Sequence, residues 1–115
     1  MNRPRPTFAI ATSISNVVAS FQVSGEFDAR TVPQFEAEVL KCTESTPDID
    51  LAVCLSAADI IDSSALGALV RLDTGQRKAN QLLTLHAPRP FQVDLLQITG
   101  LTEILTVSST CEHCR

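Results

Sequence analysis

The chain has 115 residues, of which 44% are hydrophobic and 19% are charged, and its formal net charge is −4. This length and composition predict one folded domain with its own core and exclude a disordered chain. The acidic balance disfavours nucleic-acid binding, which depends on neutralising phosphates with Lys and Arg. No apolar run reaches membrane-spanning length and no signal-peptide pattern follows the N-terminal arginines, so we expect a cytoplasmic protein with mostly reduced cysteines.

The N-terminal part of the chain predicts a β-hairpin. Residues 8–14 and 17–23 are β-favouring runs, and Ser15 and Asn16 between them predict a turn. Hydrophobic and polar residues alternate in the second run, so one face of that strand should be buried.

The hairpin is followed by a strand break and a helix start. We expect the segment Gly25-Glu26-Phe27-Asp28 to break the second strand. The segment Thr31-Val32-Pro33-Gln34 has the pattern of a capping box with proline in the first turn. It predicts a helix that runs to about Lys41.

The remaining chain alternates short apolar strands with amphipathic helices. The predicted elements are a strand at 49–55, a helix from the Asp62-Ser63-Ser64 turn to about Lys78, a strand at 81–86, a helix from Phe91 to a C-cap at Gly100, and a short strand within 101–107. Alternating strands and helices favour parallel pairing. We therefore predict a single α/β domain over residues 1–115, with a mixed sheet of about five strands and three to four helices. Its core should span residues 8–107, and residues 108–115 should form a flexible tail.

The turn at Asp62-Ser63-Ser64 is the candidate functional segment. One of these side chains can act as the helix N-cap, and capping alone is the common explanation for this pattern. The positive end of the helix dipole also stabilises an anion. A phosphoryl group on one of the serine hydroxyls would therefore be tolerated electrostatically, and it would change the surface that a partner meets.

Three short motifs along the chain resemble the landmarks of the STAS domain family, specifically its bacterial anti-sigma factor antagonists. They are Gly25-Glu26-Phe27-Asp28, Asp62-Ser63-Ser64-Ala65-Leu66-Gly67 and Thr99-Gly100-Leu101. Phe27 stands where the family usually has Leu, and Ala65 stands where it usually has Gly. The resemblance implies the STAS fold over about residues 8–107.

The resemblance also implies roles for individual residues. Ser63 would be the phosphorylated serine, with Ser64 as the alternative. The partner-binding surface would comprise Asp28, Asp62, Ser63, Ser64 and Ala65. The unphosphorylated protein would bind an anti-sigma factor and release a sigma factor, and phosphorylation of Ser63 would block binding.

The implied partners carry the catalytic chemistry. The anti-sigma factor would often itself be the serine kinase, of the histidine-kinase-like ATPase fold, and a serine phosphatase would reverse the modification. ATP would belong to the kinase, because this chain has no glycine-rich phosphate loop. We therefore expect no enzyme activity and no cofactor, and either a monomer or a weak dimer.

Three alternatives stay open. The Cys111-x2-Cys114 pair resembles half of a zinc site or a redox couple, which Cys42 and Cys54 could complete, although these two fit better as small buried residues. The same fold also occurs in scaffold or accessory subunits of stress complexes and transporters. Catalysis by Ser63 with His86 is disfavoured, because the chain lacks a nucleophile elbow.

Overall fold

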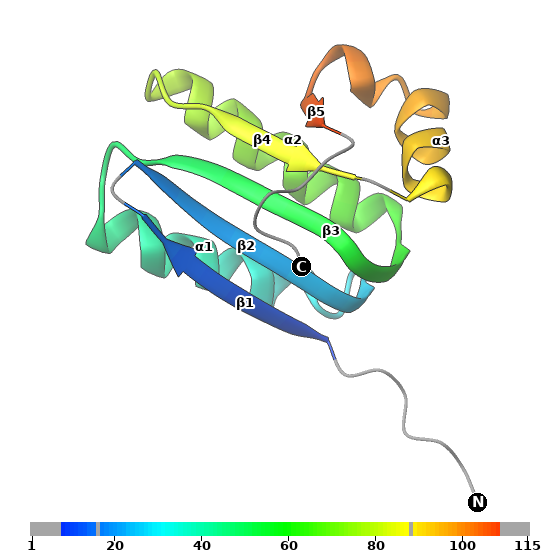
Figure 1. The fold of residues 1–115 in the computed structure, drawn as a ribbon, viewed down its shortest axis with the longest axis horizontal. Helices are drawn as coiled ribbons and strands as arrows, with labels where there is room; N and C mark the ends of the chain where they lie inside the picture. The colour runs from blue at the N-terminus through cyan, green and yellow to red at the C-terminus, as the bar shows by residue number, and fades with distance from the viewer. Residues whose placement is uncertain (1–7, 16, 88, 109–115) are drawn as a thin grey trace, which may run out of the picture.

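The computed structural model describes residues 8–15, 17–87 and 89–108. In these residues a five-stranded sheet has the order β1-β2-β3-β4-β5, with β1 antiparallel to β2 and the other neighbours parallel (Figure 1). The elements are β1 (Ala9–Ile14), β2 (Val18–Phe27), α1 (Val32–Ser45), β3 (Asp50–Ile61), α2 (Ser63–Lys78), β4 (Leu83–His86), α3 (Pro90–Ile98), the 3-10 helix η1 (Leu101–Glu103) and β5 (Thr106–Ser108). The predicted element order and the mixed α/β sheet are confirmed.

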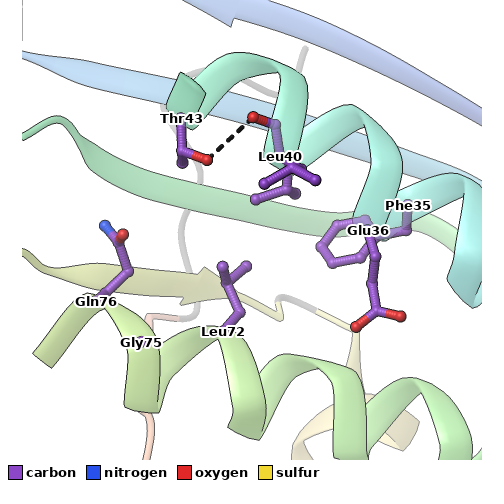
Figure 2. Close-up of a pocket in the computed structure, with 8 residues that line it drawn as sticks. Phe35, Glu36, Leu40, Thr43, Leu72, Gly75 and Gln76 are labelled. Atoms are coloured by element: carbon purple, nitrogen blue, oxygen red, sulfur yellow. Dashed lines mark hydrogen bonds between the residues drawn. The ribbon is translucent and has the colours of Figure 1, made fainter. Parts of the chain in front are cut away.

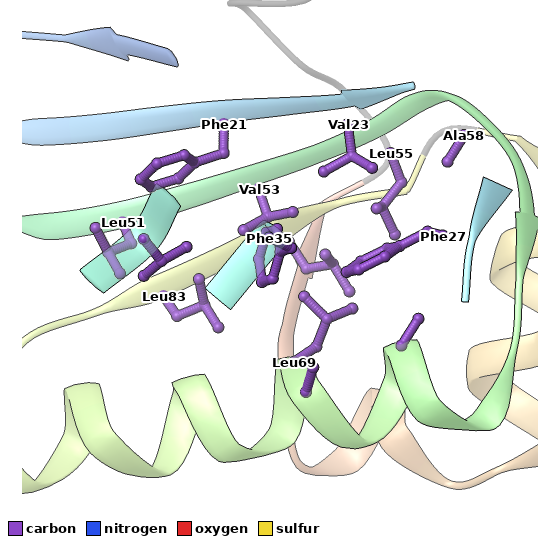
Figure 3. Close-up of a cluster of buried hydrophobic side chains, with 14 of the residues drawn as sticks. Phe21, Val23, Phe27, Phe35, Leu51, Val53, Leu55, Ala58, Leu69 and Leu83 are labelled. Carbon is purple, nitrogen blue, oxygen red and sulfur yellow. The ribbon is translucent and has the colours of Figure 1, made fainter. Parts of the chain in front are cut away.

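Helices α1 and α2 cover one face of the sheet through an aliphatic and phenylalanine core (Figure 3). The ring centroid of Phe35 on α1 lies 4.9 Å from that of Phe27 and 6.5 Å from that of Phe21, both on β2. Leu69 contributes from α2 and is fully buried. Because these side chains bury most of their area, they fix both helices against the strands whose ends carry the candidate site.

Strand β2 continues through the predicted break. It ends at Phe27, and its pairing with β3 shifts register between Gly25 and Glu26. Gly25 has a φ of 84°, which a glycine adopts without a steric penalty. The glycine therefore marks an irregularity within the strand and not its end.

Strand β3 is also longer than predicted, extending from Asp50 to Ile61 instead of stopping at Leu55. Its second half pairs with the end of β2, where Gly25 is opposite Ala58 and Phe27 is opposite Ile61. Backbone pairing to a neighbouring strand thus overrides the weak β-propensity of the small residues after Leu55.

Helix α1 begins at the predicted position, but the predicted capping box is wrong. Thr31 is the N-cap residue, yet its side chain makes no capping hydrogen bond. The Thr31 hydroxyl instead donates to the carbonyl of Glu26 at 2.9 Å and accepts from the N–H of Asp28 at 3.0 Å. The helix also runs four residues beyond the predicted end at Lys41, to Ser45.

The elements after β4 lie close to their predicted positions in the sequence, but the side chains that α3 buries are not the hydrophobic ones alone. Gly100 adopts the left-handed conformation at a φ of 75°, as expected after a helix. On α3, however, the buried residues are Gln92 and Leu96, whereas the hydrophobic side chain of Ile98 is 84% exposed. Strand β5 includes Ser108, which the sequence had placed in the tail. Among the described residues, no helix is long and apolar enough to cross a membrane.

Candidate functional site

Ser63 is the first residue of α2 and is exposed to solvent. The first bond of the helix joins the N–H of Leu66 to the carbonyl of Asp62 at 3.1 Å, so the N–H groups of Ser63 and Ser64 precede the bonded helix. They lie at the positive end of its dipole, while Arg77 and Lys78 lie in the last turn. Ser64 is half-buried and is therefore less exposed to solvent than Ser63.

Of the three candidate N-cap residues in the Asp62-Ser63-Ser64 turn, Asp62 is the N-cap of α2. Its Oδ1 accepts from the N–H of Ala65 at 2.9 Å, and its Oδ2 accepts from the N–H of Ala29 at 3.2 Å. The N–H of Asp62 donates to the carbonyl of Phe27 at 3.2 Å. One residue therefore joins the start of α2 to the loop that follows β2.

Asp28 lies in that loop, within a compact charged network. Its Oδ2 accepts from Nη2 of Arg30 at 2.9 Å, and its Oδ1 accepts from the N–H of Arg30 at 3.0 Å. Nη2 of Arg30 also donates to Glu26 at 2.6 Å. The hydrogen bond from the Arg30 side chain is the main reason that the pKa of Asp28 lies below its ordinary value. The carboxylate is thus charged and fixed in direction.

Ala65 does not belong to the surface of the site. It is completely buried, and it packs in the core together with Leu66. The residue therefore offers a partner no surface, which corrects the expectation that it contributes to partner binding. Its methyl group faces the core and leaves the approach to Ser63 unobstructed.

The cysteines differ from one another. Cys42 is free and buried on α1, and burial raises the pKa of its thiol. Cys54 is buried on β3 and is disulfide-bonded, so it is an exception to the expectation of mostly reduced cysteines. Cys111 and Cys114, the candidates for a metal site, lie outside the described residues. Within the described ranges, no three His, Cys, Asp or Glu side chains are grouped to hold a metal ion.

The loop that carries Asp28 and the start of α2 that carries Ser63 lie at the same end of the sheet, because β2 and β3 are parallel neighbours that end side by side (Figure 1). The model of the STAS domain family matches residues 9–114. The chain belongs to the STAS domain family.

The relatives of this STAS domain include bacterial regulators. It is 28% identical over 90 residues to the anti-sigma-B factor antagonist of Bacillus subtilis, with 78% of this chain and 81% of the relative covered. Its fold matches an anti-sigma factor antagonist from Mycobacterium paratuberculosis with a TM-score of 0.75 at 21% identity, covering 92% and 89% of the two chains. It also matches phosphorylated SpoIIAA, the Bacillus cell fate determinant, with a TM-score of 0.67 at 17% identity, covering 89% and 91%.

The sequence did not identify two features of the site in this STAS domain. The bond between Ala29 and Asp62 links residues 33 positions apart, and a backbone donor leaves no mark in the sequence. Arg30 could have been recognised, because the acidic Glu26 and Asp28 and the basic Arg30 lie two residues apart at the end of β2 and in the loop after it. Sequence spacing alone did not show that all three side chains meet.

Proposed function

We propose that this STAS domain is an anti-sigma factor antagonist, and that phosphorylation of Ser63 switches off its binding to the anti-sigma factor. The observation that carries the proposal is the exposure of Ser63 at the first position of α2, on a turn held by Asp62. The similarity to the anti-sigma-B factor antagonist of Bacillus subtilis supports the class of partner.

A phosphate on Ser63 would act through charge. It adds roughly −1.5 to −2 charges near neutral pH, next to the carboxylate of Asp62 and close to the loop that carries Asp28. A partner that packs over this turn would have to desolvate the phosphate among these carboxylates. Binding is therefore lost unless the partner supplies cations of its own.

The fold itself tolerates the modification. In the described part of the chain, no hydrogen bond or ion pair of the fold uses the Ser63 side chain, and the cap of α2 comes from Asp62. The phosphate also lies at the positive end of the α2 dipole, where an anion is stabilised. The same domain can thus exist in two states that share one fold and differ in surface charge.

The proposal requires a kinase and a phosphatase as partners. The kinase is the anti-sigma factor or a related serine kinase of the histidine-kinase-like ATPase fold, which binds the ATP, and a serine phosphatase restores the binding form. Ser64, which is less exposed than Ser63, is the secondary acceptor.

The test is phosphorylation in vitro with a candidate serine kinase of the histidine-kinase-like ATPase fold from the same organism. Incubation with ATP should add one phosphate, measured by intact mass, and peptide mapping should place it on Ser63. The Ser63→Ala variant should remain unlabelled, whereas Ser64→Ala should be labelled as the parent is. Full labelling of Ser63→Ala would move the site to another residue and contradict the proposal.

A further inference from the structure

The guanidinium of Arg71 lies back along α2, over Gly67. A Cβ placed on Gly67 would lie 3.4 Å from Nη1 of Arg71. Ser63, Gly67 and Arg71 follow one another at intervals of four residues, so each lies about one helical turn after the last. Arg71 therefore reaches toward the first turn of α2, and Gly67 places no side chain in its path.

The present partner of Arg71 is Glu36 on α1. Nη2 of Arg71 lies 3.4 Å from Oε2 of Glu36, and the two side chains are 62% and 47% exposed. Figure 2 shows Glu36 extending from α1 toward α2, on the side of Leu72 that faces the start of α2. A long ion pair with both partners in water contributes little to stability, so it can be exchanged at low cost.

Other arginines are held more firmly. Arg30 contacts two carboxylates, those of Glu26 at 2.6 Å and Asp28 at 2.9 Å. Arg77 contacts Asp73 at 2.8 Å and the carbonyl of Ile104 at 2.9 Å. Among these three described arginines, Arg71 has the longest ion pair, and it is directed along α2 toward Ser63.

We propose that a phosphate on Ser63 forms an ion pair with Arg71 and displaces Glu36 from it. Phosphorylation would then exchange the ion pair between α1 and α2 for one within α2. The inference rests on the proposed function, in that Ser63 carries the phosphate. A phosphate dianion attracts a guanidinium more strongly than one exposed carboxylate does, and it offers three acceptor oxygens.

The exchange of ion pairs changes the charge of a surface on α1, away from the turn that carries Ser63. Glu36 borders a groove of about 300 Å³ between α1 and α2, which is also lined by Phe35, Leu40 and Leu72 (Figure 2). When Arg71 leaves, Glu36 becomes an unpaired carboxylate on the rim of this groove. Phosphorylation at Ser63 therefore changes the charge of the α1 surface as well as that of the turn.

The test uses the full chain with phosphoserine installed genetically at position 63, so that it does not depend on any kinase. The second pKa of the phosphoserine is measured by ³¹P NMR in this protein and with Arg71→Gln, Arg71→Lys or Lys78→Gln added. Lys78→Gln is the matched control, because it removes one positive charge from the last turn of the same helix.

Loss of Arg71 should raise the second pKa by roughly 0.2–0.7 unit, the range expected for one exposed ion pair to a phosphate. Arg71→Lys should give a smaller rise, and Lys78→Gln should leave the value close to that of the parent. Equal pKa values with Arg71 and with Gln at position 71 would overturn the exchange. Because the phosphate is installed genetically, this NMR result would not bear on whether Ser63 is phosphorylated by a kinase. Conversely, a failure of the kinase to label Ser63 would contradict the proposed function and not the ion-pair exchange.

Discussion

The backbone N–H of Ala29 donates to Oδ2 of Asp62 at 3.2 Å, and this bond joins the loop after β2 to the first turn of α2. The other oxygen of the same carboxylate caps the helix at Ala65. Two segments far apart in the sequence thus form one rigid surface around Ser63. A protein that binds there meets a preformed site, whose ordering costs little on association.

Replacing Asp62 with Ala should destabilise the domain by about 1–2 kcal/mol, because both N–H groups lose their acceptor. Asp62→Asn should fall between the parent and Asp62→Ala, since its single carbonyl oxygen replaces only one of the two acceptors. The free energy of unfolding in urea measures the effect, and the neighbouring exposed Ser63→Ala variant is the control. Equal stabilities of Asp62→Ala and Ser63→Ala would show that the carboxylate does not hold the turn.

The pKa of Asp28 should depend on Arg30. The hydrogen bond from the Arg30 side chain lowers it, so Arg30→Gln should raise it toward its ordinary value. A carboxyl ¹³C NMR titration measures the shift, and Arg71→Gln, which removes an arginine paired with Glu36 instead, is the control. An unchanged titration of Asp28 in Arg30→Gln would contradict the assigned cause.

The lowered pKa of Asp28 also predicts how the free energy of unfolding of the domain changes with pH. Since the folded pKa of Asp28 is below the unfolded value of about 3.9, its contribution is complete above that pH and is lost as the pH falls through the folded pKa. Arg30→Gln should therefore lose less stability than the parent on acidification through this window. The comparison requires urea unfolding at several pH values from neutral to strongly acidic. A greater loss in the variant would reverse the predicted sign.

The buried side chain of Gln92 should be important for the end of β3. Its Nε2 donates to the carbonyl of Leu55 at 2.6 Å and to that of Ala58 at 3.2 Å, where the pairing of β3 is irregular. Gln92→Leu should cost about 1–3 kcal/mol, because these carbonyls lose a buried donor. Gln97→Leu, on the exposed side of the same helix, should leave the free energy of unfolding nearly unchanged. Equal effects of the two substitutions would contradict this role.

The element order and the start of α2 could be predicted from the sequence because both depend on local signals. Hydrophobic periodicity predicted the strands and helices, and the Asp-Ser-Ser segment before an apolar run predicted a helix start, whose N-cap the structure shows to be Asp62. The alternation in β2 correctly predicted that Phe21 and Val23 are buried.

The rest depends on contacts between distant residues. Gln92 and Gln76 are polar, yet each is buried and donates to two backbone carbonyls elsewhere in the fold. Gly25 reads as a strand break, yet β3 pairs with β2 on both sides of it. The family resemblance implied that Ala65 belongs to the partner-binding surface, but the helix turns its methyl group into the core. Polar burial and side-chain direction are set by tertiary packing, which a local pattern does not record.

In the proposed function, one phosphate on Ser63 decides whether the anti-sigma factor binds. The most direct measurement is the Kd of that partner for the unmodified domain and for the domain with phosphoserine installed at position 63, by calorimetry at equal ionic strength. We expect the unmodified domain and Ser63→Ala to bind alike, and the phosphorylated domain to bind about 100-fold or more weakly with an unchanged circular dichroism spectrum. Equal affinities of the phosphorylated and unmodified domains would contradict the account.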